Sequence, residues 1–329
     1  MKWDYDYCIT GATGFVGSNI VDEILETEPE ARILCLVRKS SDITYLHSRG
    51  VKTAVVDFSD PLTMEGPVSK SRYLLHLVGL TQARRDEMFR KVNRDLAEIM
   101  LSLYLKHRKT VKGYLFMSSL AVAGPRRASH ADPCIRSGCR PVSRYGISKL
   151  EGESLLWPWL DDPSLHIVIV RPPAVYGPRD KDMKITFEWA RRGIAPVIGW
   201  KPKKVTLIHA RDLARFSLTA LKSPPQKDPI FHVHGGEALT QMEIYREAAA
   251  AFGRRRLFTV HVPYWAALFV AWLNELCGKN KILNREKVRE INEDWGYERN
   301  DFERMGLKPR YSLREGVSDT YRINNPCRG

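Results

Sequence analysis

The succession of apolar and polar positions along the chain is typical of an α/β protein. Short runs of β-branched and aromatic residues alternate with segments in which apolar residues recur every three or four positions. The runs of strand type cover residues 5–10, 33–37, 53–56, 73–78, 113–117 and 166–170, and the helical segments cover residues 14–25, 84–107 and 143–160. Strands joined by crossover helices pair in parallel. We therefore expect a Rossmann-type, doubly wound parallel sheet with helices on both faces and ligands at the carboxyl ends of its strands.

The pattern loosens after residue 172, where prolines and glycines cluster and helical segments dominate. We therefore predict a dinucleotide-binding domain over residues 1–172 and a smaller, mostly helical substrate-binding lobe over residues 173–329. Two segments of the interval 204–234, residues 205–208 and 230–233, are expected to return to the main sheet.

One helical segment of the predicted lobe is apolar nearly all round. It covers residues 264–273 and is too short to span a bilayer. Basic residues follow it at Lys279, Lys281, Arg285, Lys287 and Arg289. An all-round apolar helix is usually buried, so we favour a helix buried between the two lobes. The wall of an apolar pocket and peripheral membrane contact through residues 262–289 are the alternatives.

The stretch TGATGFVG, residues 10–17, joins the first predicted strand to the first predicted helix. Its glycines permit a tight turn, and backbone N–H groups at the start of a helix attract a pyrophosphate. The spacing is GxxGxxG, which differs from the GxGxxG of the standard dinucleotide fingerprint. We predict that this turn binds a dinucleotide through Gly11, Thr13, Gly14, Phe15, Val16 and Gly17.

The end of the second predicted strand indicates which dinucleotide binds. A carboxylate at this point would bind the ribose 2′-hydroxyl of NAD, whereas an arginine accommodates the 2′-phosphate of NADP. The strand ends in LCLVRKSS, so Arg38 stands where the acid would be needed. We predict NADP as the cofactor and keep NAD as the alternative.

A candidate catalytic set follows the fifth predicted strand. Tyr145 and Lys149 are four residues apart in RYGISK, so on a helix they share one face. An ammonium group beside a phenol lowers the phenol's pKa, which would make Tyr145 a general acid or base. Ser118 and Ser119 end the strand in LFMSSLAVAG, where a hydroxyl group can orient a substrate carbonyl.

With these motifs in order, the chain resembles the extended short-chain dehydrogenase/reductase family, the NAD(P)-dependent epimerase/dehydratase-like enzymes, from about residue 5 to residue 320. The matching motifs are TGATGFVG, AVVDFSD (54–60), HLVG (76–79), RKVNRD (90–95), SSLAVAG (118–124), YGISK (145–149), RPPAVYGP (171–178) and LIHARDLA (207–214). The resemblance implies an oxidoreductase in which hydride passes between nicotinamide C4 and a substrate carbon.

The resemblance also implies a role for each matched position. Tyr145 is the acid/base, Lys149 lowers its pKa and holds the nicotinamide ribose, and Ser119 orients the substrate. Ser119 is chosen over Ser118 because it lies five residues before Gly124. The remaining positions are Asp57 on the adenine, Leu77, Val78 and Pro172 at the cofactor, and Asn93, which is either structural or part of a water relay. A homodimer through the helices that carry Asn93 and Tyr145 is expected on the same ground.

The stretch RPPAVYGPRD, residues 171–180, bears on the substrate. Family members that act on nucleotide sugars commonly read RxxNxxG here, with the Asn touching the nucleotide, and this chain has Ala174 in its place. The form RPxxxYGP looks more like the 3β-hydroxysteroid dehydrogenase-like and dihydroflavonol-reductase-like branches, which act on bulkier, more apolar ketones or secondary alcohols. Expected substrate contacts are Ser118, Ser119, Ala174 and Arg179.

Composition and charge restrict the partners. The net charge is +14, but the basic residues are spread along all 329 residues without a nucleic-acid motif, so we expect no nucleic-acid partner. The loop 124–144 carries five arginines against Asp132, and it either meets an anionic group of the substrate or is a solvated loop. Six scattered cysteines indicate reduced thiols and no metal site. We expect a cytoplasmic protein, with a place at the inner face of a membrane as the alternative.

Three functions compete at this point. The first is an NADP-dependent oxidoreductase that interconverts a ketone and a secondary alcohol on a bulky, apolar or lipid-like substrate. The second is a nucleotide-sugar epimerase or dehydratase, which regenerates its cofactor. The third is a non-enzymatic NADP-binding regulator, which the presence of Tyr145, Lys149 and Ser119 disfavours.

Overall fold

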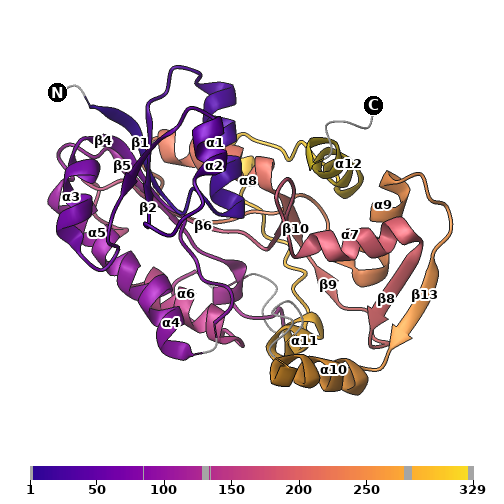
Figure 1. Cartoon of the computed structure of the whole chain (residues 1–329). Helices are drawn as coiled ribbons and strands as arrows, with labels where there is room; N and C mark the ends of the chain where they lie inside the picture. The colour runs from indigo at the N-terminus through magenta and orange to yellow at the C-terminus, as the bar shows by residue number, and fades with distance from the viewer. Residues whose placement is uncertain (1–2, 84, 128–132, 134, 278–283, 325–329) are drawn as a thin grey trace.

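The computed structural model describes residues 3–83, 85–127, 133, 135–277 and 284–324. Its centre is a parallel sheet of seven strands in the order β11-β6-β5-β4-β1-β2-β3. The strands are β1 Tyr5–Thr10, β2 Ile33–Val37, β3 Lys52–Val55, β4 Ser71–His76, β5 Gly113–Met117, β6 Ile167–Arg171 and β11 Ile230–His232. The predicted Rossmann-type α/β fold is confirmed (Figure 1).

The strand order reverses at β1, which lies between β2 and β4. Thr10, the last residue of β1, is in register with Leu36 on one side and with His76 on the other. The Thr10 hydroxyl and His76 Nδ1 are 2.8 Å apart and buried. In an open α/β sheet, the crevice beside such a switch point is where ligands bind.

Helices cover both faces of the sheet (Figure 1). Helices α1 Phe15–Thr27 and α8 Ala210–Lys222 pack together on one face. The other face carries α3 Pro61–Ser69, α5 Leu96–Lys106 and α6 Arg144–Ser154. Neighbouring strand residues point to opposite faces, so Ile9 belongs to the first core and Cys8 to the second. Burial on both sides explains why the strands are continuously apolar.

Short helical segments complete the sheet domain. They are α2 Thr44–Ser48, α4 Asp86–Arg90, η1 Lys91–Asp95, η2 Leu120–Val122, η3 Trp157–Trp159 and, further along the chain, η4 Glu303–Met305. The helix predicted over residues 84–107 is present from Asp86, but its middle, η1, is π-helical; residue 84 lies outside the described part. A π segment inside a helix adds a local bulge, which the apolar pattern does not reveal.

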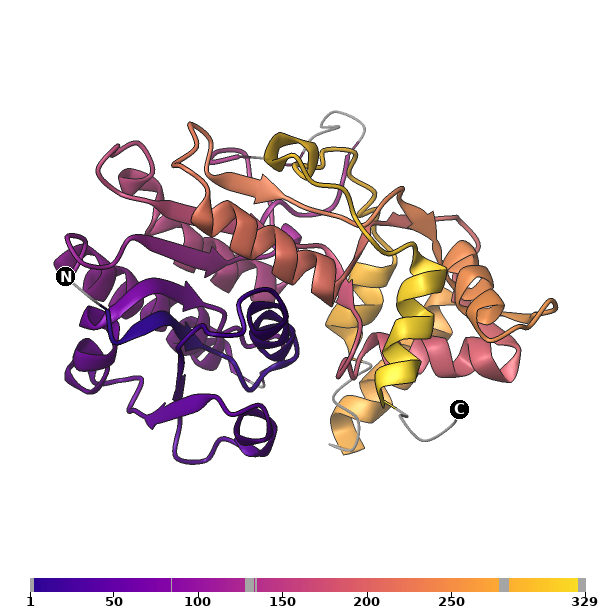
Figure 2. The same ribbon diagram turned by 90° about the horizontal axis from the view of Figure 1, so that it is seen from above.

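The smaller lobe lies beside the carboxyl ends of the central strands (Figure 2). Its helices are α7 Met183–Arg192, α9 Gln241–Ala251, α10 Tyr264–Cys277, α11 Arg285–Ile291 and α12 Leu313–Asn324. Its strands pair as β7 Ala174–Tyr176 with β10 Leu207–His209, β9 Lys204–Val205 with β12 Leu239–Thr240, and β8 Ile194–Ile198 with β13 Phe258–Val262. Side chains of α7, α9 and α12 form its core, including Phe187, Ile244 and Val317.

Of the two segments predicted to return to the main sheet, one does so. Strand β11 pairs with β6, whereas residues 205–208 are divided between β9 and β10 and belong to two-stranded sheets of the lobe. That prediction is wrong because a short apolar run does not specify its partner strand. A third segment also returns, since Phe302 packs in the sheet core and the Asp301 carboxylate accepts a 2.7 Å hydrogen bond from the His232 N–H.

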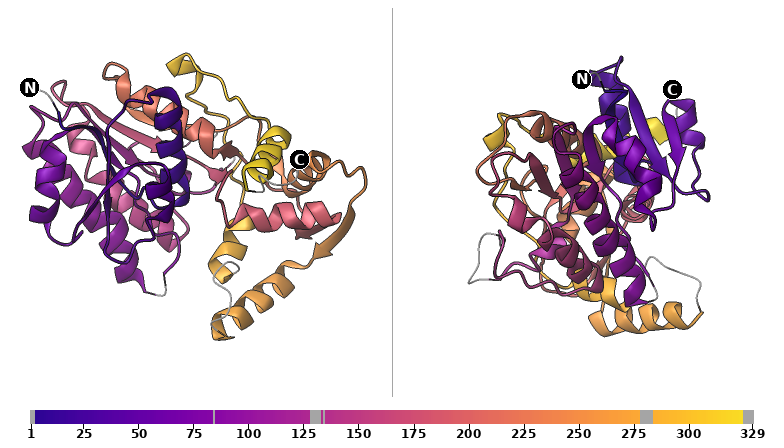
Figure 3. Two further views of the ribbon diagram at one scale, coloured as in Figure 1. Left: turned by 45° about the horizontal axis from the view of Figure 1, so that its top comes forward. Right: turned by 90° about the vertical axis from the view of Figure 1, so that its left-hand side faces the viewer.

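Two further expectations need correction. The thiols of Cys8 and Cys35 are free and buried, but Cys139 is disulfide-bonded, so the prediction of six reduced thiols is wrong at that residue. Helix α10 is not buried between the lobes, because its Trp265 side chain is 73% exposed and the helix lies at the edge of the molecule (Figure 3). In the part of the chain that is described, no helix combines the length and the apolar character needed to cross a bilayer.

Candidate active site

The glycine turn between β1 and α1 is packed too tightly for side chains. Gly11 has φ of +81°, and a Cβ there would lie 2.8 Å from the Leu77 carbonyl carbon and the Val78 nitrogen. A Cβ at Gly17 would collide with the Gly11 carbonyl oxygen. The turn therefore presses against the end of β4, and this contact explains why Leu77 and Val78 belong to the same site.

Helix α1 begins with an open end. Its N-cap is Gly14, which makes no side-chain cap hydrogen bond, and Thr13 and Gly14 are exposed. The first N–H groups of a helix, here from Phe15 onward, have no acceptor within the helix and attract an anion. The turn therefore fits the pyrophosphate of a dinucleotide.

Three predicted cofactor contacts follow the carboxyl ends of sheet strands. Arg38 follows β2 with an exposed side chain, and its guanidinium forms no ion pair with the residues that the structure describes. Asp57 is exposed, and hydrogen bonds from the backbone and hydroxyl of Ser59, at 2.8 and 2.6 Å, lower the pKa of its carboxyl. Pro172 is buried after β6, and its carbonyl accepts a 2.8 Å bond from the Leu120 N–H.

The structure brings Tyr145 and Ser119 together. Tyr145 is half-buried in the first turn of α6, and its hydroxyl is hydrogen-bonded to Ser119. Ser119 is the N-cap of η2, and its Oγ also accepts a 3.2 Å bond from the Ala121 N–H. The two hydroxyl groups can therefore face one substrate oxygen, as the sequence predicts.

The expected effect of Lys149 on Tyr145 does not occur. Burial raises the pKa of Tyr145 to about 12, the Ser119 hydrogen bond opposes this rise, and Glu290 adds to it. The Lys149 ammonium instead donates a 2.6 Å bond to the Met117 carbonyl oxygen and lies 4.4 Å from the centre of the Phe116 ring. The prediction of a lowered tyrosine pKa is wrong here, because desolvation of the phenol is the largest influence on that pKa and Lys149 is not among the groups that shift it.

A buried polar network lies beneath these residues. The Glu153 and Arg171 side chains have no exposed surface, and Arg171 Nε donates to a Glu153 oxygen at 2.9 Å. Trp157 Nε1 also donates to Glu153, at 3.0 Å, and so does Ser118 Oγ, at 2.5 Å. Ser118 is 3% exposed and turned away from Ser119, which speaks against its predicted contact with substrate.

The sequence reasoning missed this network, although one signal was available. Glu153 stands four residues after Lys149 and eight after Tyr145, so all three share one helix face. Arg171 is the first residue of the RPPAVYGP motif, but roles were predicted only for later positions of that motif.

Asn93 is structural in this arrangement. Its Oδ1 accepts a 2.8 Å bond from the Leu80 N–H, and its Nδ2 donates to the Leu80 carbonyl and the Ser148 hydroxyl. A Cβ at Gly152 would collide with the Asn93 carbonyl oxygen, so α6 packs directly on η1. Of the two readings of Asn93, these contacts favour the structural one.

The predicted substrate residues of the lobe have different surroundings. Ala174 is half-buried at the start of β7, in register with Leu207. The Arg179 guanidinium donates to Ser18 Oγ and to an Asp22 oxygen, both at 2.7 Å, so it is bound to α1. Its predicted contact with substrate therefore finds no support in these contacts.

The glycine turn follows β1, Arg38 follows β2, Ser119 follows β5, and Tyr145 and Lys149 lie on α6, so the predicted site residues gather at the carboxyl edge of the sheet. The family model described as "NAD dependent epimerase/dehydratase family" matches residues 7–233. The chain belongs to this family. The family binds NAD(P), and the protein is an NAD(P)-dependent enzyme of the oxidoreductase type.

Relatives of this epimerase/dehydratase-family protein include different reactions. The UDP-glucose 4-epimerase of Vibrio cholerae is 27% identical over 320 residues, which cover 95% of this chain and 93% of that protein. The ceramide reductase of Caulobacter vibrioides is 28% identical over 293 residues, which cover 87% and 84%. The solved Thermus thermophilus UDP-glucose 4-epimerase in complex with NAD has a TM-score of 0.73 at 20% identity, covering 96% of this chain and 98% of that one.

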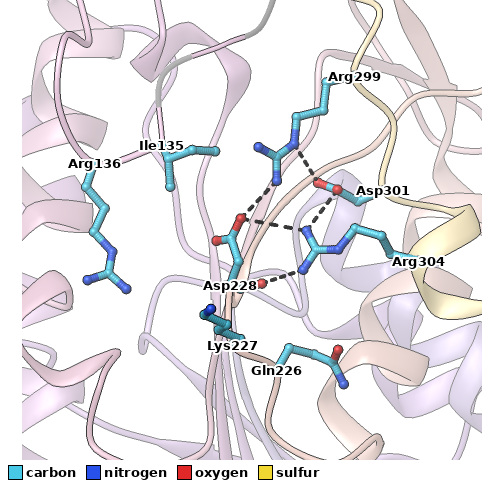
Figure 4. A pocket seen from close by; sticks show the side chains of 8 residues that line it. All are labelled: Ile135, Arg136, Gln226, Lys227, Asp228, Arg299, Asp301 and Arg304. Carbon is cyan, nitrogen blue, oxygen red and sulfur yellow. Dashed lines mark hydrogen bonds and ion pairs between the residues drawn. The ribbon is translucent and has the colours of Figure 1, made fainter.

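A separate pocket of about 720 Å³ lies beside the start of the outer strand β11, and none of the predicted catalytic residues lines it (Figure 4). Its charges neutralise one another, since Arg299 and Arg304 are both paired with Asp228 and Asp301. A pocket whose guanidinium groups already bind carboxylates has little to offer a second anion.

Three arginines in the described part of the basic loop 124–144 form ion pairs. Arg126 pairs with Glu298 at 3.2 Å, Arg136 with Asp161 at 2.6 Å, and Arg144 with Asp86 at 3.1 Å. These pairs favour a structural role over contact with substrate. Asp132 lies outside the described residues.

The buried carboxylate gives a stability prediction. Replacing Glu153 with alanine leaves the Arg171 guanidinium buried without its counter-charge, so the free energy of unfolding should fall by about 3–5 kcal/mol. Chemical denaturation measures this change. The matched control is Glu151→Ala on the same helix, whose partner Arg90 is exposed and whose loss should cost less than about 1 kcal/mol. Equal losses in both variants would contradict the assignment.

Lys149 gives a pH prediction. Burial lowers the pKa of Lys149 from 10.5 to about 8, so between these values the unfolded chain binds one proton more than the folded chain. Stability should therefore rise with pH through this window, by up to about 3 kcal/mol relative to the Lys149→Met variant. Denaturation of both proteins from pH 7 to 10.5 measures the difference. The exposed-site variant Lys112→Met should keep the wild-type slope, and a Lys149→Met variant with that slope would disprove the prediction.

Proposed function

We propose that this protein is an NADP-dependent oxidoreductase that interconverts a ketone and a secondary alcohol on a bulky, apolar substrate. Ala174 carries the proposal. It occupies the position at which nucleotide-sugar enzymes of the family commonly have Asn, and a methyl group cannot make the hydrogen bonds of an amide. The half-buried place of Ala174 in β7, beside Leu207, is consistent with an apolar contact.

The preference for NADP rests on charge. Arg38 and Lys39 are exposed at the end of β2, where a carboxylate would be required for the ribose of NAD. The Arg38 N–H donates to Ser41 Oγ at 3.2 Å, which shapes the turn and leaves the guanidinium available for a 2′-phosphate.

The residues around Tyr145 would handle the proton. When bound, the cofactor supplies hydride transfer at its nicotinamide ring. Tyr145 keeps its proton at neutral pH, because its pKa is raised to about 12, and can donate it to a carbonyl oxygen during reduction. Ser119 would hold the same oxygen, and the Lys149 ammonium would hold a ribose hydroxyl.

An apolar substrate is also supported by a relative. The ceramide reductase is named for a lipid, and its identity and coverage are similar to those of the UDP-glucose 4-epimerase. The similarity to that epimerase supports a second candidate function, nucleotide-sugar epimerisation, in which the cofactor undergoes no net change.

A homodimer through the helices of the Rossmann domain would fit this proposal. Met88 of α4 and Ile147 of α6 are 48% and 45% exposed, and these helices pack together. A second copy on these helices would cover both side chains.

The proposed reaction predicts net consumption of NADPH. Purified protein with a panel of long-chain ketones should oxidise NADPH, followed by absorbance, and Tyr145→Phe should lose turnover by at least ~100-fold because it lacks the proton donor. NADPH affinity of this variant, measured by fluorescence, should remain close to that of the wild type.

The same panel distinguishes the second candidate. Conversion of UDP-glucose without net change of the cofactor would overturn the reductase proposal in favour of epimerisation. Full NADPH oxidation by Tyr145→Phe would remove Tyr145 from the proposed role.

Cofactor selectivity gives a separate prediction. Arg38→Ala should weaken NADPH binding by ~10–100-fold, the value of one charge-assisted phosphate contact, and leave NADH binding nearly unchanged. Isothermal titration measures both. The control is Arg32→Ala before the same strand, whose side chain pairs with Asp6. Tighter binding of NADH than of NADPH by the wild type would refute the assignment.

A further inference from the structure

Helix α10 exposes its largest apolar side chains to solvent, although a helix that packs only on its own protein would bury them. Trp265, Phe269, Trp272 and Leu273 are 73%, 54%, 41% and 40% exposed. Their spacing of four, seven and eight residues places them on one stripe of the helix. The stripe is therefore a continuous apolar surface turned away from the fold.

The opposite face of α10 packs on the fold, with two alanines at its centre and the partly buried Tyr264 and Leu268 beside them. Ala267 and Ala271 are buried against Val288 of α11, with Ile198 and Val262 packed around them. A helix that served only the lobe's core would bury its tryptophans there, because burial of a large side chain stabilises a fold by about 1.5–3 kcal/mol. In α10 the largest apolar residues are exposed instead, and an exposed apolar patch of this kind marks an interaction surface.

A third tryptophan continues the surface beyond the start of α10. Trp200 is 67% exposed and stacks on His261, with ring centres 6.2 Å apart. The Gly199 N–H donates a 2.9 Å bond to the Val262 carbonyl, which fixes this loop two residues before α10. Three exposed tryptophans thus lie on α10 and on the loop that follows β8.

Basic side chains border this apolar edge. Lys201 and Lys203 follow Trp200 and form no ion pair with the described part of the chain. On α11, next to α10, Arg289 is exposed and forms no ion pair with the described residues, whereas the exposed Arg285 and Lys287 pair with Glu275 and Glu290. Tryptophan at the boundary with lysine and arginine around it is the composition of a helix that lies in the surface of an anionic bilayer.

The edge is also connected to the catalytic helix. The Arg144 N–H, at the start of α6, donates a 2.5 Å hydrogen bond to the Glu286 carboxylate of α11. The charge of Glu290, on the same helix α11, raises the pKa of Tyr145. Helix α11 thus contacts both the apolar helix α10 and the segment that bears the acid/base group.

We propose that α10 and the Trp200 loop dock the protein on the surface of a bilayer that contains anionic phospholipid. The 14 residues of α10 would lie in the plane of the surface, with Trp265, Phe269 and Trp272 among the acyl chains and the lysines at the headgroups. The proposal extends the proposed function, because an apolar ketone or alcohol dissolves in the bilayer from which the enzyme would take it.

Vesicle flotation with the full chain tests the proposal. The protein should float at low salt with vesicles of phosphatidylcholine that contain one third phosphatidylglycerol, and much less with phosphatidylcholine alone. Trp265→Ser/Phe269→Ser should reduce the partition coefficient at least ~10-fold, since it removes two large side chains from the lipid contact. The control Leu62→Ser, at a residue 77% exposed on α3, should float like the wild type.

Three results would overturn the proposal. They are no flotation of the wild type at low salt, flotation of the double variant at the wild-type level, or a wild-type oligomer that dissociates in the double variant, which would show a second copy on this face. Turnover of a short, water-soluble ketone separates this test from the reaction itself. The double variant should keep the wild-type rate there, so loss of docking with retained turnover affects the docking surface alone.

Discussion

The buried ion pair between Glu153 and Arg171 connects the elements that must meet around the substrate. Arg171 ends β6, Glu153 lies in the last turn of α6, and the Ser118 hydroxyl at the end of β5 donates to the same carboxylate. Two charges without exposed surface are costly to bury, so they are tolerated only where their partners are complete. Because Ser118 is fixed by this carboxylate, the next residue, Ser119, is directed to Tyr145.

Close backbone packing imposes the second constraint on the site. Gly11 lies against the end of β4, and Gly152 lies against the Asn93 carbonyl. A side chain at Gly11 would push the glycine turn away from the sheet, and a side chain at Gly152 would push α6 away from η1. The dinucleotide turn and the catalytic helix are therefore held from opposite sides by contacts that only glycine permits.

Much of the sheet domain followed from local patterns. Apolar runs located β1 to β6, and the spacing of TGATGFVG and YGISK located the turn before α1 and the first turn of α6, because strand and helix periods are properties of the sequence. Partners distant in the chain did not follow. Residues 205–208 joined other strands, and the Glu153–Arg171 pair depends on contact between two elements.

Electrostatic surroundings were equally beyond the sequence. A lysine four residues from Tyr145 suggested a lowered pKa, but the direction is decided by how much water the phenol keeps, and the fold removes most of it. The exposure of α10 has the same cause. An all-round apolar helix looks buried in a sequence, and only the alanines at its contact with α11 show which face is inward.

The contact between Glu286 and the backbone of Arg144 has a mechanical consequence. The N–H groups in the first turn of a helix need acceptors from outside the helix, and α6 has two side-chain acceptors, its N-cap Ser143 and, about 140 residues later in the chain, Glu286 of the other lobe. A movement of α10 and α11 therefore withdraws a cap from the turn that carries Tyr145. The position of the lobe's outer helices and the order of the turn that carries Tyr145 are therefore coupled through α11.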